Sequence, residues 1–194
     1  MASVLAMMFL VIFASLAAAM AVVAQGNLRT ADSALKVSRA QSAAESGLVF
    51  AARRLEKEGA RVVIREGFVD NDLVADIWKG PLPLDAEVEP ADGYESDATS
   101  LAQAIYDANL ADVSAFSPVP AEHDGLPEID ANGLVITKPL RIDPGVDRLW
   151  FQLTFELIQD PIDDRTRVRV TSLGVDGEIR RTLSLDFDIL KRIE

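Results

Sequence analysis

The sequence predicts an α+β fold in which a long N-terminal helix packs on a C-terminal antiparallel β-meander. Residues 1–24 contain no charged residue, no Gly and no Pro, and a helical pattern continues without a break to about Glu58. Residues 148–194 show the alternation of apolar and polar residues that is typical of half-buried strands. We divide the chain into an apolar helix half (1–26), an amphipathic helix half (27–58), a loop-rich acidic region (59–147) and the meander (148–194).

The apolar half of the helix is long enough to cross a membrane. A helix of about 20 residues spans a hydrocarbon core of about 30 Å, and the first charged residue of this chain is Arg29. The alternative is a signal peptide cleaved after Ala24, but no Lys or Arg precedes the apolar core and the helical pattern continues through that point. A buried core helix is disfavoured because little else in the chain could surround it. We therefore expect a single-pass membrane segment.

The amphipathic half carries an apolar stripe at three- and four-residue steps, which predicts that one helix face covers a sheet. Small residues near Gly47 allow a sheet or a neighbouring helix to approach closely, and Gly59 is a natural position for the helix to end. The stripe consists of Leu28, Ala31, Leu35, Ala44, Leu48, Ala51 and Leu55.

The loop-rich region contains eight of the nine prolines, between Pro81 and Pro144. Within it the sequence predicts a short strand at residues 61–65, a helical turn at 72–78 and a helix at 100–110, with the remainder in loops. The final part predicts strands at residues 149–158, 166–173 and 180–189, and the last two are joined by a turn that contains Asp176-Gly177. The apolar face of this meander is the expected partner of the helix stripe.

Composition excludes several classes of function. The net charge is -12, so nucleic-acid binding is not expected, because it requires a basic surface. The chain has no Cys, which excludes disulfides and a thiol nucleophile. The single His123 lies in an acidic, proline-rich loop without a Gly-x-Ser-x-Gly segment, so we expect no catalysis.

Acidic loops leave calcium binding open, although no other cofactor is expected. Carboxylate oxygens on a flexible loop suit this cation, and Asp160, Asp163 and Asp164 share the loop between two predicted strands. A second group, Asp70 to Asp72 with Asn71 between them, is a weaker candidate, and neither group has the spacing of an EF-hand loop. Such acidic turns are also common as purely solvated loops.

Two segments resemble type IV pilins and type II secretion pseudopilins. Residues 38–48 (SRAQSAAESGL) resemble the helix segment of PilX-type minor pilins and GspK-type pseudopilins. Residues 170–174 (VTSLG) and 177–183 (GEIRRTL) resemble the terminal hairpin of the same proteins. The resemblance covers roughly residues 4–58 and 165–190. It implies a structural role in cell adhesion or protein transport, with other pilin-like subunits as partners through the N-terminal helix.

The chain departs from these families at its N-terminus. They carry a basic leader that ends in Gly and is removed by a prepilin peptidase, but no such site is present here. Either no processing occurs, or a leader lies upstream of Met1. Such a leader would reverse the orientation that Arg29, Lys36 and Arg39 alone indicate, which is a cytoplasmic C-terminal domain. The domain is then extracytoplasmic and the helix is held in the inner (cytoplasmic) membrane, from which the subunit could enter a surface filament.

The apolar segment also lacks the acidic residue that major pilins usually carry near their fifth position, where Leu5 stands here. That carboxylate pairs with the N-terminal amine of a neighbouring subunit, and an unpaired one is costly in a membrane. Its absence favours a minor, priming or tip subunit of a type IV pilus or type II secretion filament. The alternative is a signal-anchored or secreted extracytoplasmic binding domain that has no role in a filament.

Overall fold

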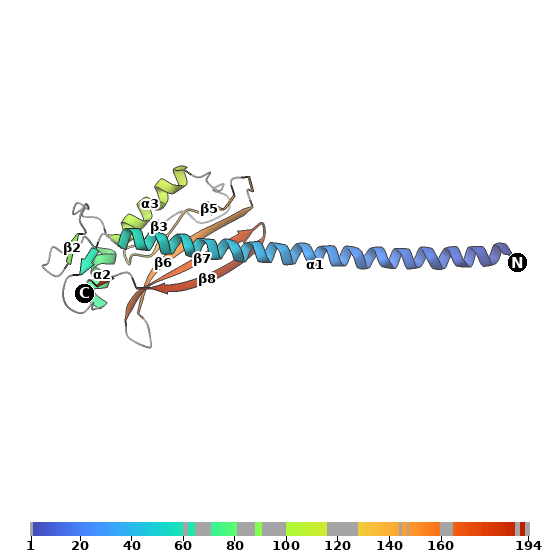
Figure 1. Ribbon diagram of the computed structural model, residues 1–194, viewed down its shortest axis with the longest axis horizontal. Helices are drawn as coiled ribbons and strands as arrows, with labels where there is room; N and C mark the ends of the chain where they lie inside the picture. Colours follow the sequence, from blue (N-terminus) through green and yellow to red (C-terminus); the bar gives the residue numbers. More distant parts are fainter. Residues whose placement is uncertain are drawn as a thin grey trace. The chain divides into compact units, whose positions relative to one another are not determined.

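The computed structural model of the chain has the predicted α+β architecture (Figure 1). It describes residues 2–59, 62–64, 71–80, 88–90, 100–115, 128–143, 145–146, 148–159, 165–188 and 191–192. The elements in chain order are α1 (Ala2–Gly59), β1 (Val62–Ile64), α2 (Asn71–Lys79), β2 (Val88–Pro90), α3 (Leu101–Ala115), β3 (Glu128–Ile129), β4 (Val135–Ile136), β5 (Leu140–Arg141), β6 (Leu149–Gln159), β7 (Thr166–Asp176), β8 (Ile179–Phe187) and β9 (Lys191–Arg192).

The chain forms two compact units, Met1–Ser38 and Arg39–Glu194. The first unit consists of the first part of α1, where Ala, Leu and Met, all good helix formers, predominate. In its last turns Lys36 Nζ pairs with Asp32 Oδ2 at 2.6 Å, one helical turn apart. The division at Ser38 and Arg39 reflects contacts within the structure, whereas the sequence-based division at residues 26 and 27 reflects composition.

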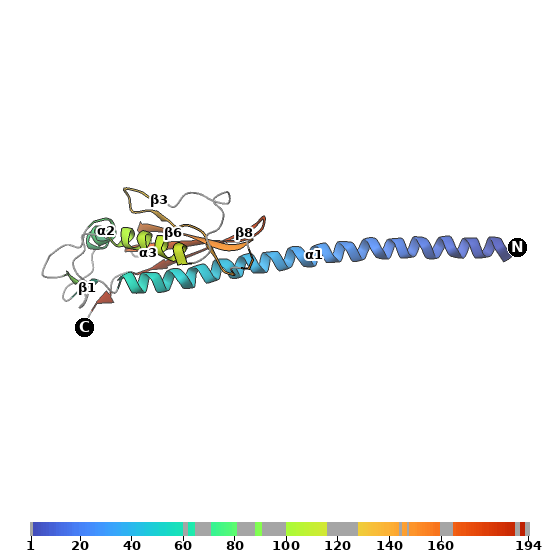
Figure 2. The same ribbon diagram turned by 90° about the horizontal axis from the view of Figure 1, so that it is seen from above.

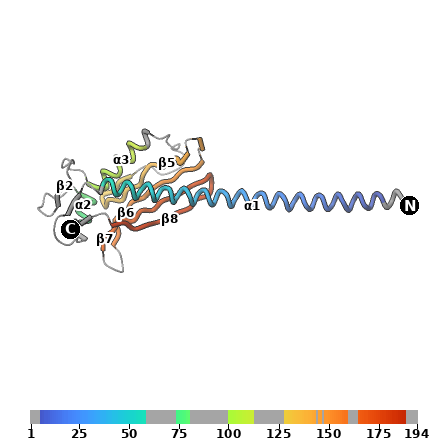
Figure 3. The backbone as a smooth tube through the Cα atoms, in the orientation of Figure 1, coloured from blue at the N-terminus to red at the C-terminus, as the bar shows by residue number. Residues whose placement is uncertain are grey.

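The second unit contains a six-stranded sheet with the order β3-β4-β6-β7-β8, in which β5 also pairs with β6 (Figures 2 and 3). All of its pairings are antiparallel. β6 pairs with β7 from Leu149 opposite Asp176 to Gln159 opposite Thr166. β6, β7 and β8 form the predicted meander, whereas β3, β4 and β5 come from the region expected to be rich in loops.

A second, three-stranded sheet has the order β2-β1-β9. β1 matches the strand expected near residue 63, and it pairs antiparallel with β2 and parallel with β9. The pairing of Val63 with Lys191 brings the segment after α1 next to the C-terminal strand of the chain.

The helical expectations in the middle of the chain are confirmed with wider limits. The turn expected at 72–78 is α2, and the helix expected at 100–110 is α3, which continues to Ala115. Ser100 Oγ accepts a hydrogen bond from Gln103 N at 3.1 Å and caps α3. Trp78 in α2 donates its indole N–H to Gly133 O at 2.7 Å, which joins α2 to the hairpin of β3 and β4.

The hydrophobic core lies on one face of the six-stranded sheet. It combines Leu55 of α1, Trp78 of α2 and Ile105 of α3 with Phe155 and Val168 of the sheet. On the other face of β7 and β8, polar pairs such as Arg169–Asp186 and Thr171–Ser184 connect the two strands. The same face also carries a small apolar cluster of Trp150, Leu173 and Val175, so it is mixed in character, whereas the helix-covered face is apolar.

The buried stripe of α1 differs from the expected one. Leu28 and Leu35 have 70% and 49% of their surface exposed, and Leu48 is only half-buried. The buried positions of α1 begin at Ala40, because the sheet that α1 covers belongs to the second unit. The buried residues of α1 are Ala40, Ala43, Ala44, Gly47, Ala51, Leu55 and Glu58.

Candidate interaction surfaces

The first part of α1 exposes a continuous apolar surface. Met7, Phe9 and Phe13 have 73%, 58% and 65% of their surface exposed, and no residue of the most apolar 18-residue window is buried. That window has a mean hydropathy of 2.6, and the helix around it, Ala6–Glu58, is the one described helix that is long and apolar enough to cross a membrane. A membrane anchor and a signal sequence share these properties.

The second part of α1 lies unusually close to β7, because both elements have small residues where they meet. A methyl group on Gly174 would overlap the backbone oxygen of Ala40 and the backbone nitrogen of Ala44. A methyl group on Gly47 would overlap the hydroxyl of Ser172 and lie 2.9 Å from the Phe151 ring. The two glycines therefore allow the helix backbone to contact the strand directly, which places α1 in one defined position on the sheet.

One end of this contact holds a buried carboxylate. Asp176, at the end of β7, has no exposed surface, and neither of its oxygens makes a hydrogen bond of good geometry with the described residues. Its charge is balanced by Arg148 Nε at 3.2 Å from Oδ1 and by Arg39 Nη1 of α1 at 4.0 Å from Oδ2. Because a buried charge without a partner is strongly destabilising, Asp176 links the end of β7 to α1 through Arg39 and to the start of β6 through Arg148.

The other end has a second group of charges. Arg54 Nη1 of α1 lies 3.6 Å from Oε1 of the buried Glu58, and Arg54 also contacts the carboxylate of Asp112 in α3. The guanidinium of Arg54 stands 5.6 Å from the centre of the Phe50 ring, a cation–π arrangement. Ion pairs thus connect α1 to the rest of its unit near both ends of the small-residue contact.

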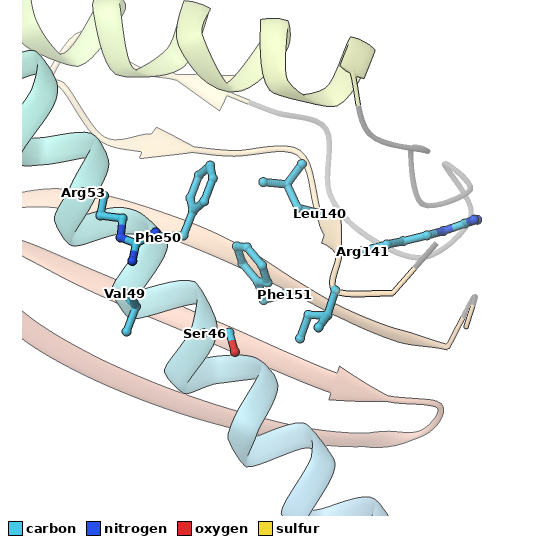
Figure 4. Close-up of a pocket in the computed structure, with 8 residues that line it drawn as sticks. Ser46, Val49, Phe50, Arg53, Leu140, Arg141 and Phe151 are labelled. Atoms are coloured by element: carbon cyan, nitrogen blue, oxygen red, sulfur yellow. The ribbon is translucent and has the colours of Figure 1, made fainter. Parts of the chain in front are cut away.

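Beside this contact, an open groove of about 290 Å³ runs between α1 and strands β5 and β6 (Figure 4). Its floor includes the rings of Phe50 and Phe151, whose centres are 5.8 Å apart at an angle of 54°. Val49 and Ile142 on its rim are 56% and 38% exposed. The lining residues are Ser46, Val49, Phe50, Arg53, Leu140, Arg141, Ile142 and Phe151.

The candidate calcium ligands Asp160, Asp163 and Asp164 lie outside the described residues, and so do Asp70 and His123. In the part of the chain that the structure describes, no group of three or more His, Cys, Asp or Glu side chains is arranged to hold a metal ion. Calcium binding therefore stays a prediction.

Sequence patterns pointed to only part of these surfaces. The apolar segment and the small residues near Gly47 were evident, whereas the Arg39–Asp176 pair and the groove join residues that are distant in the sequence. A comparison of the chain with family profiles, with curated proteins and with solved structures finds no match.

Proposed function

We propose that this protein is a non-catalytic, pilin-like subunit that is held in the inner membrane by the first part of α1 and assembles laterally with other pilin-like subunits. Its second unit is extracytoplasmic. The subunit belongs to a type IV pilus or a type II secretion filament, in a minor, priming or tip position. It passes from the bilayer into the filament by exchanging lipid contacts for contacts with neighbouring helices.

The observation that carries this proposal is that the two parts of the 58-residue helix α1 differ in exposure. Up to Ser38 the helix belongs to a unit of its own and exposes large apolar side chains, whereas from Ala40 onward one face of it is buried in the second unit. A large exposed apolar surface marks a site of membrane or protein association. The first part of α1 therefore needs lipid or other helices around it.

The residues behind the family resemblance have a role inside the subunit. Ala40, Ala44 and Gly47, all within the pilin-like segment, form the close contact with β7. Residues so used are not available to neighbouring subunits. This supports lateral assembly through the part of the helix before Ser38. The first acidic residue there is Asp32, so the apolar segment offers no carboxylate to a subunit above it.

Membrane fractionation and crosslinking of the full chain test the proposal. We expect the chain to stay with membranes at high salt and to crosslink to other pilin-like subunits in substoichiometric amounts. Phe13→Asp should abolish the crosslinks, because a carboxylate in hydrocarbon costs about 3 kcal/mol. Leu185→Asp makes the same kind of change at an exposed apolar position of the second unit and should leave the crosslinks intact.

Three other experimental outcomes would each contradict a different part of the proposal. A soluble chain whose N-terminus is Gln25 would establish signal-peptide cleavage. Membrane attachment without any pilin-like partner would favour the anchored binding domain. Long filaments of this protein alone would contradict the minor-subunit assignment.

A further inference from the structure

We propose that the groove between α1 and β5–β6 binds a segment of a second, different protein, which inserts one bulky apolar side chain and places a carboxylate beside Arg53. This site is separate from the apolar part of α1 and does not depend on the filament role. All of its lining residues belong to the second unit.

The size of the groove fits one large side chain. Pockets for complete small-molecule ligands usually measure about 300–1,000 Å³, and this groove, at about 290 Å³ and open to solvent, falls just below that range. Protein partners commonly bind by placing one aromatic or aliphatic side chain in an apolar pocket with a polar rim. The tilted Phe50 and Phe151 rings provide an apolar floor for such a side chain.

The groove is formed before any partner binds. Leu140 of β5 pairs with Phe151 of β6, which fixes one wall, and Gly47 packs against Phe151 and Ser172, which fixes the other wall. Because little has to be ordered on binding, a small contact of this kind loses less free energy to immobilisation than a flexible one would.

The charge at the rim indicates an acidic partner. Arg53 is exposed, and no carboxylate among the described residues pairs with it, whereas its neighbour Arg54 is engaged by Glu58 and Asp112. In Figure 4, Arg53 stands on α1 next to Phe50, while the side chain of Arg141 extends away from the two rings. Arg141, which also lines the groove, pairs with Trp150 in the register of β5 and β6, one position beyond the Leu140–Phe151 pair.

The partner is a different protein, because two copies of this chain repel one another. Each copy has a net charge of -12, and like charges of this size oppose association. Arg53 is a local positive site on an acidic protein, so it selects for a short acidic and apolar segment within a partner of lower overall charge.

Short synthetic peptides are the probe, and the full chain in lipid nanodiscs is the target. The peptides carry a central Phe flanked by Glu, Gln or Lys, and binding is measured by fluorescence anisotropy. An exposed charge pair contributes about 0.2–1 kcal/mol, so the Glu peptide should bind up to about fivefold more tightly than the Lys peptide. A central Ala in place of Phe should abolish binding.

Two variants and a control complete the experiment. Arg53→Glu should reverse the preference between the Glu and Lys peptides, while Arg181→Glu, an equal charge change at an exposed position of β8, should leave it unchanged. Val49→Trp should weaken all Phe peptides by about tenfold by filling the groove. The proposal is overturned if Arg53→Glu and Arg181→Glu act alike, if Phe can be replaced by Ala without loss, or if the variants alter binding only to vesicles of anionic lipid.

Discussion

Gly174 decides how closely α1 can lie on β7. A methyl group at this position would overlap backbone atoms of Ala40 and Ala44, which cannot move without moving the helix. Gly47 makes the reciprocal contact, although there part of the obstruction is the side chain of Ser172, which can rotate. Because backbone cannot turn away as a side chain can, the contact at Gly174 is the stricter of the two.

We therefore expect Gly174→Ala to lower the free energy of unfolding by about 1–3 kcal/mol, the usual cost of overpacking. Gly26→Ala is the matched control, because no atom lies within 4 Å of a methyl group there and Ala favours a helix. Thermal melting of the full chain in nanodiscs measures both. Equal melting temperatures for the two variants would show that α1 does not rest on β7 as described.

Sequence reasoning at the residue scale succeeded for small side chains and failed for charged ones. The cluster of small residues near Gly47 predicted a close approach, and the structure confirms it against β7. Nothing in the local sequence distinguishes the buried Asp176 from the exposed Asp188, since both lie near the ends of neighbouring strands. Only the three-dimensional arrangement brings Arg39 and Arg148 to Asp176.

At the scale of elements, Asp176 of β7 pairs with Arg39 of α1 and with Arg148, which immediately precedes β6. Removing both arginines, in Arg39→Ala/Arg148→Ala, leaves a buried carboxylate without a cation and should cost about 3–5 kcal/mol of unfolding free energy. Adding Asp176→Asn to the double variant removes the charge and should recover most of that loss. Chemical denaturation of the wild type, the double variant and the triple variant measures the three unfolding free energies. A triple variant no more stable than the double variant would show that the arginines contribute by packing alone.

The β7–β8 hairpin should respond to acid through Asp186. Arg169 donates hydrogen bonds of 2.8 and 2.9 Å to this carboxylate, which lower the pKa of Asp186 from its ordinary value of 3.8. A lowered pKa in the folded state stabilises the fold above the ordinary pKa, and this contribution is lost as the pH falls through the folded-state value.

Asp186→Asn should therefore be less stable than the wild type at pH 7, by at most about 1 kcal/mol because the pair is partly exposed. The two proteins should converge as the pH falls through the folded-state pKa of Asp186, which lies below its ordinary value of 3.8, because the wild-type carboxylate is then protonated as well. Melting temperatures between pH 2 and pH 7 test this. A difference that stays constant across that range would exclude the Arg169–Asp186 pair as its source.

The elements that the sequence predicted are those with a long local pattern. β6, β7 and β8 alternate over many residues, so their positions were evident, as was α3. β3, β4 and β5 have two residues each, too few to show alternation. β4 and β5 form because β6 offers them an edge, and β3 pairs in turn with β4. The parallel pairing of β1 with β9 joins the segment after α1 to the C-terminal strand, a contact that no local pattern records.

At the scale of the whole molecule, α1 contributes residues to both units, and the two parts of the helix differ in composition. The first unit has an uncharged surface all round before Arg29, and the second needs one face of small residues. The sequence-based division at residues 26 and 27 separates the apolar half of the helix from the amphipathic half, which is a division by composition. The structural division falls at Ser38 and Arg39, where the sheet begins to cover the helix.

Two shortened chains test this division. A chain that begins at Asn27 keeps Arg39 and every buried residue of α1, so we expect it to be soluble and to melt at the same temperature as the full chain. A chain that begins at Glu45 loses the backbone of Ala40 and Ala44 against Gly174, together with the Arg39 partner of Asp176. It should be destabilised by several kcal/mol, from exposed core and a half-paired buried charge. If the Glu45 chain melts like the Asn27 chain, residues 39–44 are not part of the folded unit, and the boundary lies further along α1.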